Sequence, residues 1–318
     1  MYTRDCFGVI AENGRRRVTI FDTNTFEVLQ QIPLDADAID VAITNDCTRA
    51  FVTSFNSKTM FQIDLTETPA RVIGSAVSPT FLEDVAVTPD GKFAVSVDGS
   101  ASNQDIVSYS AKVNAFVSLL PTSAQAVAIS PECRELVLTA QIANNVVHRF
   151  VINPNGSLED SGQSFPAGPR PINIVFSPDG QFAFVANANS NASSISVLST
   201  RMPDNVTLLG STRSSDNPQS MAITRDGRYL FALTSANVDI FAFDPVAGSL
   251  TLLRSFAHGL SISPFFGVDQ IALDACETKL FISAVGQVAV FTTYGLRLGN
   301  VAGAEGPGGI AICTMRSR

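Results

Sequence analysis

The chain has 318 residues, of which 45% are hydrophobic and 16% charged, and its net charge is −8. This apolar content excludes an intrinsically disordered chain, and the acidic balance argues against a nucleic-acid-binding protein, which normally presents a basic surface. No run of about 18 apolar residues occurs, so we expect no membrane span.

A short apolar motif recurs along the whole chain. The seven copies are Asp40–Thr44, Asp84–Thr88, Ala126–Ser130, Asn173–Ser177, Ser220–Thr224, Gln270–Asp274 and Gly309–Cys313. Successive copies begin 44, 42, 47, 47, 50 and 39 residues apart. A period of about 45 residues is typical of β-propellers, in which each repeat forms one blade of four strands.

Each of the first six copies is followed by a turn and by three further runs with a strand pattern. In the unit that begins at Asp84, the turn is Pro89–Gly91, the second run is Phe93–Ser96 and the third is Ile106–Ser110. A fourth, more polar run closes each unit, as in Arg71–Val77. We expect the first strand to lie near the crowded axis and the fourth to be half solvated.

The two ends of the chain complement each other. Gly309–Cys313 has no strands after it, whereas the N-terminal runs Phe7–Ala11, Val18–Asp22 and Glu27–Leu34 have no first strand before them. We therefore expect a blade shared between residues 1–35 and 303–318, which would cover two open sheet edges. Six further blades would lie between residues 36 and 302, within a single domain over 1–318. The predicted fold is an all-β, seven-bladed propeller of four-stranded antiparallel blades.

Two segments carry a resemblance to a known family. They are Ser177–Asn187 followed by Ser194–Leu198, and Val87–Val95. With them, the chain resembles the YVTN-type seven-bladed propellers and the related bacterial lactonase-like propellers. The resemblance implies the fold more strongly than an activity, because propellers of this kind serve as binders, lyases, lactonases and scaffolds.

Two positions depart from the lactonase-like pattern. In that family a Pro-Arg-His segment precedes an inner strand and a glutamate follows the second strand. Here Arg170 is kept, but Pro171 stands in place of the histidine and Asn187 in place of the carboxylate. The departures argue against lactone hydrolysis.

The resemblance implies that ligands bind where the inner strands begin, so the residues at these points are our site candidates. Asp40 and Asp84 hold equivalent positions in adjacent blades, where facing carboxylates raise each other's pKa or hold a cation. Asn173 and Gln270 begin two other copies. Glu83 and Asp269 lie one residue earlier, so strand alternation is expected to turn them away. The alternative is a purely structural role, in which these carboxylates only accept hydrogen bonds from loop amides.

Two further residues complete the candidate set. Arg170 lies on a loop that leads into an inner strand, where its guanidinium could clamp a carboxylate. His258 lies in a loop between blades, near Ser261 and Asp269. No GxSxG nucleophile motif, phosphate-binding loop or dinucleotide fingerprint occurs, and two separated histidines do not form a zinc or haem site. We therefore expect no metal and no cofactor.

Two hypotheses about function follow. The first is a binding or interaction propeller that takes a small molecule or a protein partner at an acidic channel mouth. The alternative is a small-molecule enzyme of the lactonase or lyase type, with the mouth carboxylates as acid and base and Arg170 as an anion clamp. Buried facing carboxylates beside Arg170 would favour the enzyme.

The cysteines and the N-terminal residues bear on the compartment. The five cysteines, with no close pairs, do not read as a disulfide framework, so all five are expected to be free thiols. The N-terminal residues lack the pattern of a secretory signal. We expect a cytoplasmic protein; a secreted or cell-surface location would require that an export signal has been removed. The cysteines are Cys6, Cys47, Cys133, Cys276 and Cys313.

Overall fold

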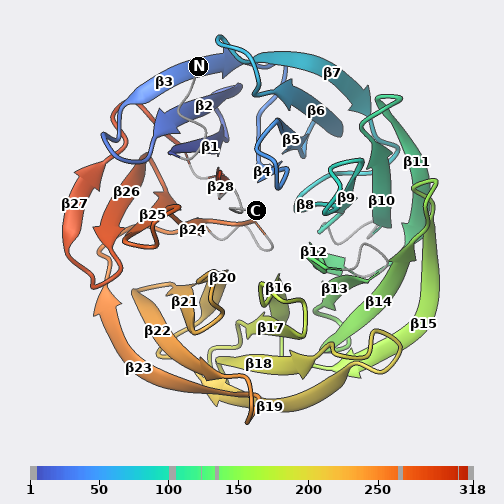
Figure 1. The fold of residues 1–318 in the computed structure, drawn as a ribbon, viewed down its shortest axis with the longest axis vertical. Coiled ribbons are helices and arrows are strands. Elements are labelled where there is room, and N and C mark those ends of the chain that lie inside the picture. The colour runs from blue at the N-terminus through green and yellow to red at the C-terminus, as the bar shows by residue number, and fades with distance from the viewer. Residues whose placement is uncertain are drawn as a thin grey trace.

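The structure, a computed structural model, consists of seven antiparallel four-stranded sheets arranged as blades around a central channel (Figure 1). It describes residues 6–99, 105–122, 124–132, 136–263, 268–306 and 308–313. Its elements in these ranges are all strands, which confirms the predicted seven-bladed propeller. No helix in these ranges is long and apolar enough to cross a membrane.

The blades are numbered here along the chain, and within each one the strands are given from the channel outwards. Blade 1 contains β28 (Ile310–Ile312), β1 (Phe7–Glu12), β2 (Arg17–Asp22) and β3 (Val28–Pro33). Blade 2 contains β4 (Asp40–Ile43), β5 (Arg49–Ser54), β6 (Thr59–Asp64) and β7 (Arg71–Val77). Blade 3 contains β8 (Val85–Val87), β9 (Phe93–Val97), β10 (Asp105–Ser110) and β11 (Ala115–Pro121).

The remaining blades follow the same order. Blade 4 contains β12 (Ala124–Ile129), β13 (Val137–Gln141), β14 (Val146–Ile152) and β15 (Leu158–Pro166). Blade 5 contains β16 (Pro171–Phe176), β17 (Phe182–Asn187), β18 (Ser194–Ser199) and β19 (Thr207–Arg213). Blade 6 contains β20 (Pro218–Ile223), β21 (Tyr229–Thr234), β22 (Asn237–Asp244) and β23 (Ser249–Ala257). Blade 7 contains β24 (Ile271–Leu273), β25 (Lys279–Ala284), β26 (Gln287–Thr292) and β27 (Arg297–Asn300).

The turns between the first two strands of the blades follow from their sequences. Asp90 accepts hydrogen bonds from the backbone N–H of Lys92 at 3.1 Å and from the hydroxyl of Thr88 at 2.8 Å. Gly91 has a φ of 67°, in the left-handed region that glycine adopts without strain. The equivalent Gly180 and Gly227 have φ values of 64° and 71°. The Asp-Gly turns thus reverse the chain, so that the second strand of the blade pairs with its inner strand.

The ring closes as the sequence predicts. β28 pairs antiparallel with β1, with Gly8 opposite Ile312 and Ile10 opposite Ile310. The C-terminal strand therefore forms the innermost strand of a blade whose other three strands come from the N-terminus (Figure 1).

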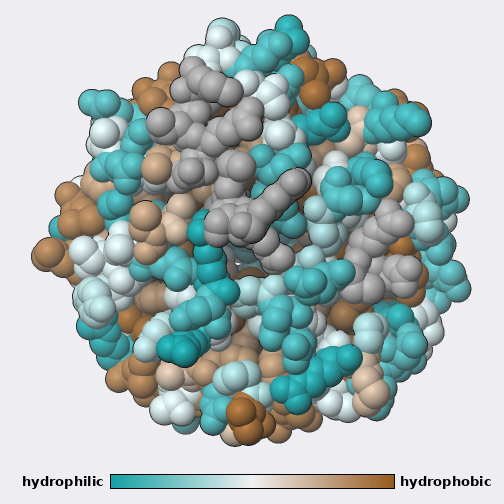
Figure 2. Space-filling view, viewed as in Figure 1, coloured by the Kyte–Doolittle hydropathy of each residue, from teal (hydrophilic) through white to brown (hydrophobic). Residues whose placement is uncertain are grey.

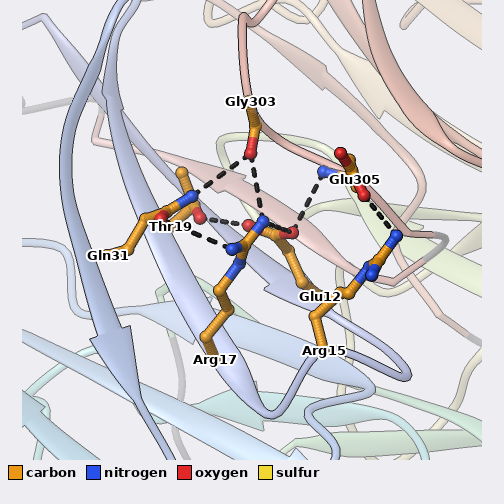
Figure 3. Close-up of polar contacts among 7 residues, drawn as sticks. All are labelled: Glu12, Arg15, Arg17, Thr19, Gln31, Gly303 and Glu305. Carbon is orange, nitrogen blue, oxygen red and sulfur yellow. Dashed lines mark hydrogen bonds and ion pairs between the residues drawn. The ribbon is translucent and has the colours of Figure 1, made fainter.

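A buried glutamate ties the segment before β28 to the N-terminal strands (Figure 3). Glu12 is fully buried, and its Oε2 accepts hydrogen bonds from Arg17 Nη2 at 2.8 Å and from the backbone N–H of Glu305 at 3.0 Å. The hydroxyl of Thr19 donates to its Oε1. Arg17 also donates to the carbonyl of Gly303 at 3.1 Å, so one charged pair links both chain ends.

A disulfide between Cys47 and Cys313 corrects the expectation of five free thiols. We expected free thiols because the sequence contains no close pair of cysteines. Cys313, however, directly follows an inner strand, and inner strands of neighbouring blades converge at the axis, which brings its Cα within 5.5 Å of that of Cys47. Cys6 and Cys276 are free, and Cys133 lies outside the described residues.

Candidate functional site

The predicted positions at the start of the inner strands form a buried polar ring. Asp40 begins β4, Asp84 precedes β8, Asn173 lies in β16 and Gln270 precedes β24. These four residues expose 0%, 3%, 1% and 0% of their surface. They are therefore shielded from solvent, unlike the open acidic mouth that the sequence led us to expect.

Each of the two predicted aspartates accepts a hydrogen bond from the inner strand of the next blade. Oδ2 of Asp40 accepts a hydrogen bond from the backbone N–H of Val85 at 3.0 Å. Oδ2 of Asp84 does the same for Val127 at 2.7 Å. These contacts match the alternative in which the carboxylates only accept hydrogen bonds from amides, because each carboxyl binds a backbone N–H of the neighbouring inner strand.

A third carboxylate, Asp269, joins Asp40 and Asp84. We expected strand alternation to turn Asp269 away, but the strand begins only at Ile271, so the alternation does not extend to it. Its Oδ1 accepts a hydrogen bond from Nδ2 of Asn173 at 3.1 Å, which links blade 7 to blade 5. Its charge also acts on both other aspartates. We refer to Asp40, Asp84 and Asp269 as the carboxyl cluster.

Burial sets the protonation of the carboxyl cluster. It raises the pKa of Asp40 to about 8, with a further contribution from the charge of Asp269. The pKa of Asp84 is also raised, first by burial and then by Asp40 and Asp269. The pKa of Asp269 rises by burial to about 6, and its hydrogen bond from Asn173 opposes the rise. Burial therefore favours the protonated form of these carboxyl groups, and the pKa of Asp269 is raised less than that of Asp40.

Glu83 belongs to a separate buried group. Its Oε2 accepts a hydrogen bond from Nε2 of Gln125 at 3.3 Å. Burial raises its pKa to about 8, with smaller contributions from the charges of Asp98 and Asp40. Asp98, also buried, accepts a hydrogen bond from the hydroxyl of Thr80 at 2.8 Å.

The central channel contains a cavity of about 890 Å³. The third residue of every repeat, from Ala42 to Ala311, lines it, and all are alanine except Val175. From the segments that precede the inner strands, Asp269 is part of the lining. The other polar lining residues follow inner strands, so the cavity extends from their turns to the carboxyl cluster. Figure 2 shows a small hollow near the centre of one face, with hydrophilic residues beside it.

Arg170 and His258 are held elsewhere, and neither lines this cavity. The backbone N–H of Arg170 donates to Oδ1 of Asn145 at 2.8 Å, and its Nη1 donates to the carbonyl of Ala188 at 3.4 Å. His258 is buried, which lowers its pKa. Its Nδ1 accepts from the backbone N–H of Leu260 at 3.0 Å, and its Nε2 lies 3.1 Å from the carbonyl oxygen of Thr234. Both ring nitrogens thus contact backbone atoms around the loop.

Sequence reasoning missed one further polar group, on the outer strands of blade 4. Nδ1 of His148 lies 2.7 Å from Oγ of Ser164, and its Nε2 lies 2.6 Å from Oδ1 of Asp160. His148 and Ser164 are direct cross-strand partners in the β14–β15 register. The pairing of these two strands would have been the signal, because it puts a histidine opposite a hydroxyl.

Comparisons with known proteins agree with the fold. A family model described as lactonase, 7-bladed beta-propeller, matches residues 164–261. No curated protein matches the chain. Among solved structures, a functionally unknown protein from Desulfotomaculum acetoxidans is 42% identical, with a TM-score of 0.94, over 98% of this chain and 100% of that one.

Two more distant structures carry names that refer to lactones. A periplasmic gluconolactonase from Pseudomonas aeruginosa is 15% identical with a TM-score of 0.78, over 96% of this chain and 99% of that one. A putative 6-phosphogluconolactonase from Bacteroides fragilis is 15% identical with a TM-score of 0.75, over 98% of each chain. At this identity they share the fold alone. With the family model, the complete ring and the 42% identical relative, the chain belongs to the lactonase-like seven-bladed β-propeller family.

Proposed function

We propose that the protein binds a small molecule in its central channel, with Asp269 as the residue that contacts the polar end of the ligand. One observation carries the proposal: Asp269 belongs both to the lining of the channel cavity and to the buried carboxyl cluster. A ligand in the cavity would therefore reach the half-buried carboxylate of Asp269 beside the buried Asp40 and Asp84.

The cavity has the character of a ligand site. Binding sites for small molecules commonly enclose about 300–1,000 Å³ and combine apolar walls with a few polar groups. Here the walls are mainly alanine, valine and isoleucine side chains, and the polar group at the inner end is Asp269. A protein partner, the other occupant expected from the sequence, would meet the outer turns rather than the inner end of the cavity.

The second candidate is lactone hydrolysis. It is favoured by the membership of the lactonase-like family and by an ionised Asp269 beside the protonated Asp40. In this reaction Asp269 would take a proton from water as the oxygen of that water attacks the lactone carbonyl carbon. The ring C–O bond then breaks, and the leaving oxygen receives this proton from Asp269, which returns to its ionised form.

The residue that replaces the family's glutamate does not take part in this arrangement. Asn187 is fully buried, and its Nδ2 donates to the carbonyl of Val185 at 3.3 Å and to the hydroxyl of Ser196 at 3.0 Å. Hydrolysis in this chain would therefore depend on Asp269 instead.

Nile red, a neutral dye whose fluorescence rises in apolar surroundings, tests the ligand site. We expect it to bind the wild-type protein and to lose this binding in Ala222→Trp, which fills the channel from its wall. The matched control is Leu253→Trp on the exposed outer strand β23, which is expected to bind as the wild type does. Equal binding by all three folded proteins would contradict a channel site.

Hydrolysis of glucono-δ-lactone tests the second candidate. Turnover above the spontaneous rate that disappears in Asp269→Asn would establish it. A rate equal to the spontaneous one in the wild-type protein would exclude this lactone as a substrate and leave the binding function as the proposal.

A further inference from the structure

We propose that the channel ligand is an organic cation, an alkylamine-like molecule whose ammonium group contacts Asp269 while its apolar part lies along the alanine walls. The inference rests on the proposed binding function and names the chemical class of its ligand. It excludes phosphorylated and carboxylated ligands from the same site.

The charges along the cavity favour a cation. Its described lining contains five carboxylates and a single guanidinium, that of Arg225. The carboxylates are Glu132, Asp179, Asp269, Asp274 and Glu277. Part of this charge is compensated, since Lys279 lies 3.4 Å from Asp274 and Glu132 has an interaction partner of its own. The remaining excess, in a chain of net charge −8, attracts cations and repels anions such as phosphate.

The inner end of the cavity needs hydrogen-bond donors. Asn173 supplies one to Asp269, and backbone amides supply one each to Asp40 and Asp84. Asp40 and Gln270 lie outside the lining of the cavity, so among the residues that precede the inner strands Asp269 is the acceptor that a ligand in the cavity reaches. An ammonium group carries three donors and no acceptor, which suits the carboxylate of Asp269 at this end of the cavity.

The size of the charge argues for a monovalent ligand. Burial raises the pKa of Asp40 to about 8 and also raises that of Asp84, which favours their neutral forms, whereas the pKa of Asp269 is about 6, so Asp269 is the carboxylate that a cation contacts. In the described ranges, no group of three or more His, Cys, Asp or Glu side chains is suited to hold a metal ion. An alkylammonium ion matches this single charge, and its chain matches the apolar walls.

The test is displacement of Nile red by three molecules of equal chain length: heptylamine, heptanol and heptanoate. At about pH 8 the amine is expected to displace the dye at a roughly tenfold lower concentration than the alcohol, because a charge-assisted hydrogen bond is stronger than a neutral one. Heptanoate is expected to be the weakest of the three.

Asp269→Asn should bring heptylamine to the level of heptanol. The matched control, Asp35→Asn, removes an exposed aspartate outside the cavity and should leave the difference intact. A second measurement uses the wild-type protein at about pH 5, where Asp269 becomes protonated and the advantage of the amine should disappear. The groups that face Asp269 are Asp40, Asp84 and Asn173, and burial favours the neutral form of both of these aspartates.

The outcomes separate the two proposals. Displacement by heptanol or heptanoate at concentrations equal to or below that of heptylamine would overturn the cation inference and leave the binding function in place. An unchanged amine advantage in Asp269→Asn would also overturn it. Failure of Nile red to bind in the channel would instead overturn the proposed function.

Discussion

At the scale of single residues, Asp84 combines a structural hydrogen bond with a raised carboxyl pKa in one side chain. The hydrogen bond from Val127 favours its ionised form, but burial and the neighbouring aspartates outweigh this effect and raise its pKa. A carboxyl group whose pKa is higher in the folded state than in the unfolded state destabilises the fold as pH rises through the interval between the two values.

We therefore expect Asp84→Asn to flatten the pH dependence of stability. The wild-type protein should lose stability from about pH 4 upwards through neutrality, whereas the amide cannot ionise and still accepts the hydrogen bond from Val127. Urea unfolding at about pH 5 and pH 8 measures this. Asp84→Ala should be less stable at both pH values by about 1–3 kcal/mol, because it leaves the Val127 N–H unpaired. Parallel pH profiles for wild type and Asp84→Asn would contradict the account.

Gly309 gives a second residue-scale prediction. A Cβ added here would lie 1.8 Å from Oδ1 of Asp40 and 2.9 Å from its Cα, so Gly309→Ala must displace the carboxyl cluster. We expect a loss of about 1–3 kcal/mol of unfolding free energy, measured by thermal or urea unfolding. Gly210→Ala is the control, because nothing lies within 4 Å of the added Cβ. Equal stability of the two variants would show that Asp40 does not pack against Gly309.

At the scale of elements, the disulfide fastens the end of β28 to the turn that follows β4. It joins residues 266 positions apart, so it restricts a large part of the unfolded chain. Disulfides persist in oxidising compartments and are rare in the cytosol. The bond therefore favours an oxidising location over the cytoplasmic one expected from the sequence.

Loss of this disulfide should weaken the fold. Cys47→Ser and Cys313→Ser are each expected to cost about 2–5 kcal/mol, whereas Cys276→Ser removes an exposed free thiol and should cost little. Thiol titration in denaturant should find two more reactive thiols per chain after reduction than before. An identical thiol count with and without reductant would mean that the bond does not form.

The strands could be predicted from sequence because their signals are local. The repeat at Asp84 combines an apolar run, the Pro89–Gly91 turn and a second apolar run, and each of these patterns depends only on neighbouring residues. The disulfide and the position of Asp269 depend instead on distances across the ring. Alternation also fails at Asp269 because it lies in a loop, and the enclosure of Asp40 depends on several blades at once.

At the scale of the whole molecule, the ring depends on its shared blade. Deleting Gly309–Arg318 removes β28 together with one half of the disulfide, and it leaves the inner edge of β1 without its partner. We expect unfolding or aggregation, detected by light scattering and by loss of the cooperative thermal transition. Cys313→Ser separates the two causes, since it removes only the disulfide. A truncated chain that melts as Cys313→Ser does would show that β28 contributes nothing to closure.

The most direct measurement of the central claim is an NMR titration of the aspartate carboxyl carbons, with Asp269 assigned by comparison with Asp269→Asn. If Asp269 lies in a buried cluster that receives a cationic ligand, its pKa should be about 6 in the free protein. Saturating heptylamine should lower this pKa, because a nearby cation favours the carboxylate. A pKa near the ordinary value of 3.8, unmoved by heptylamine, would contradict both the cluster and the site.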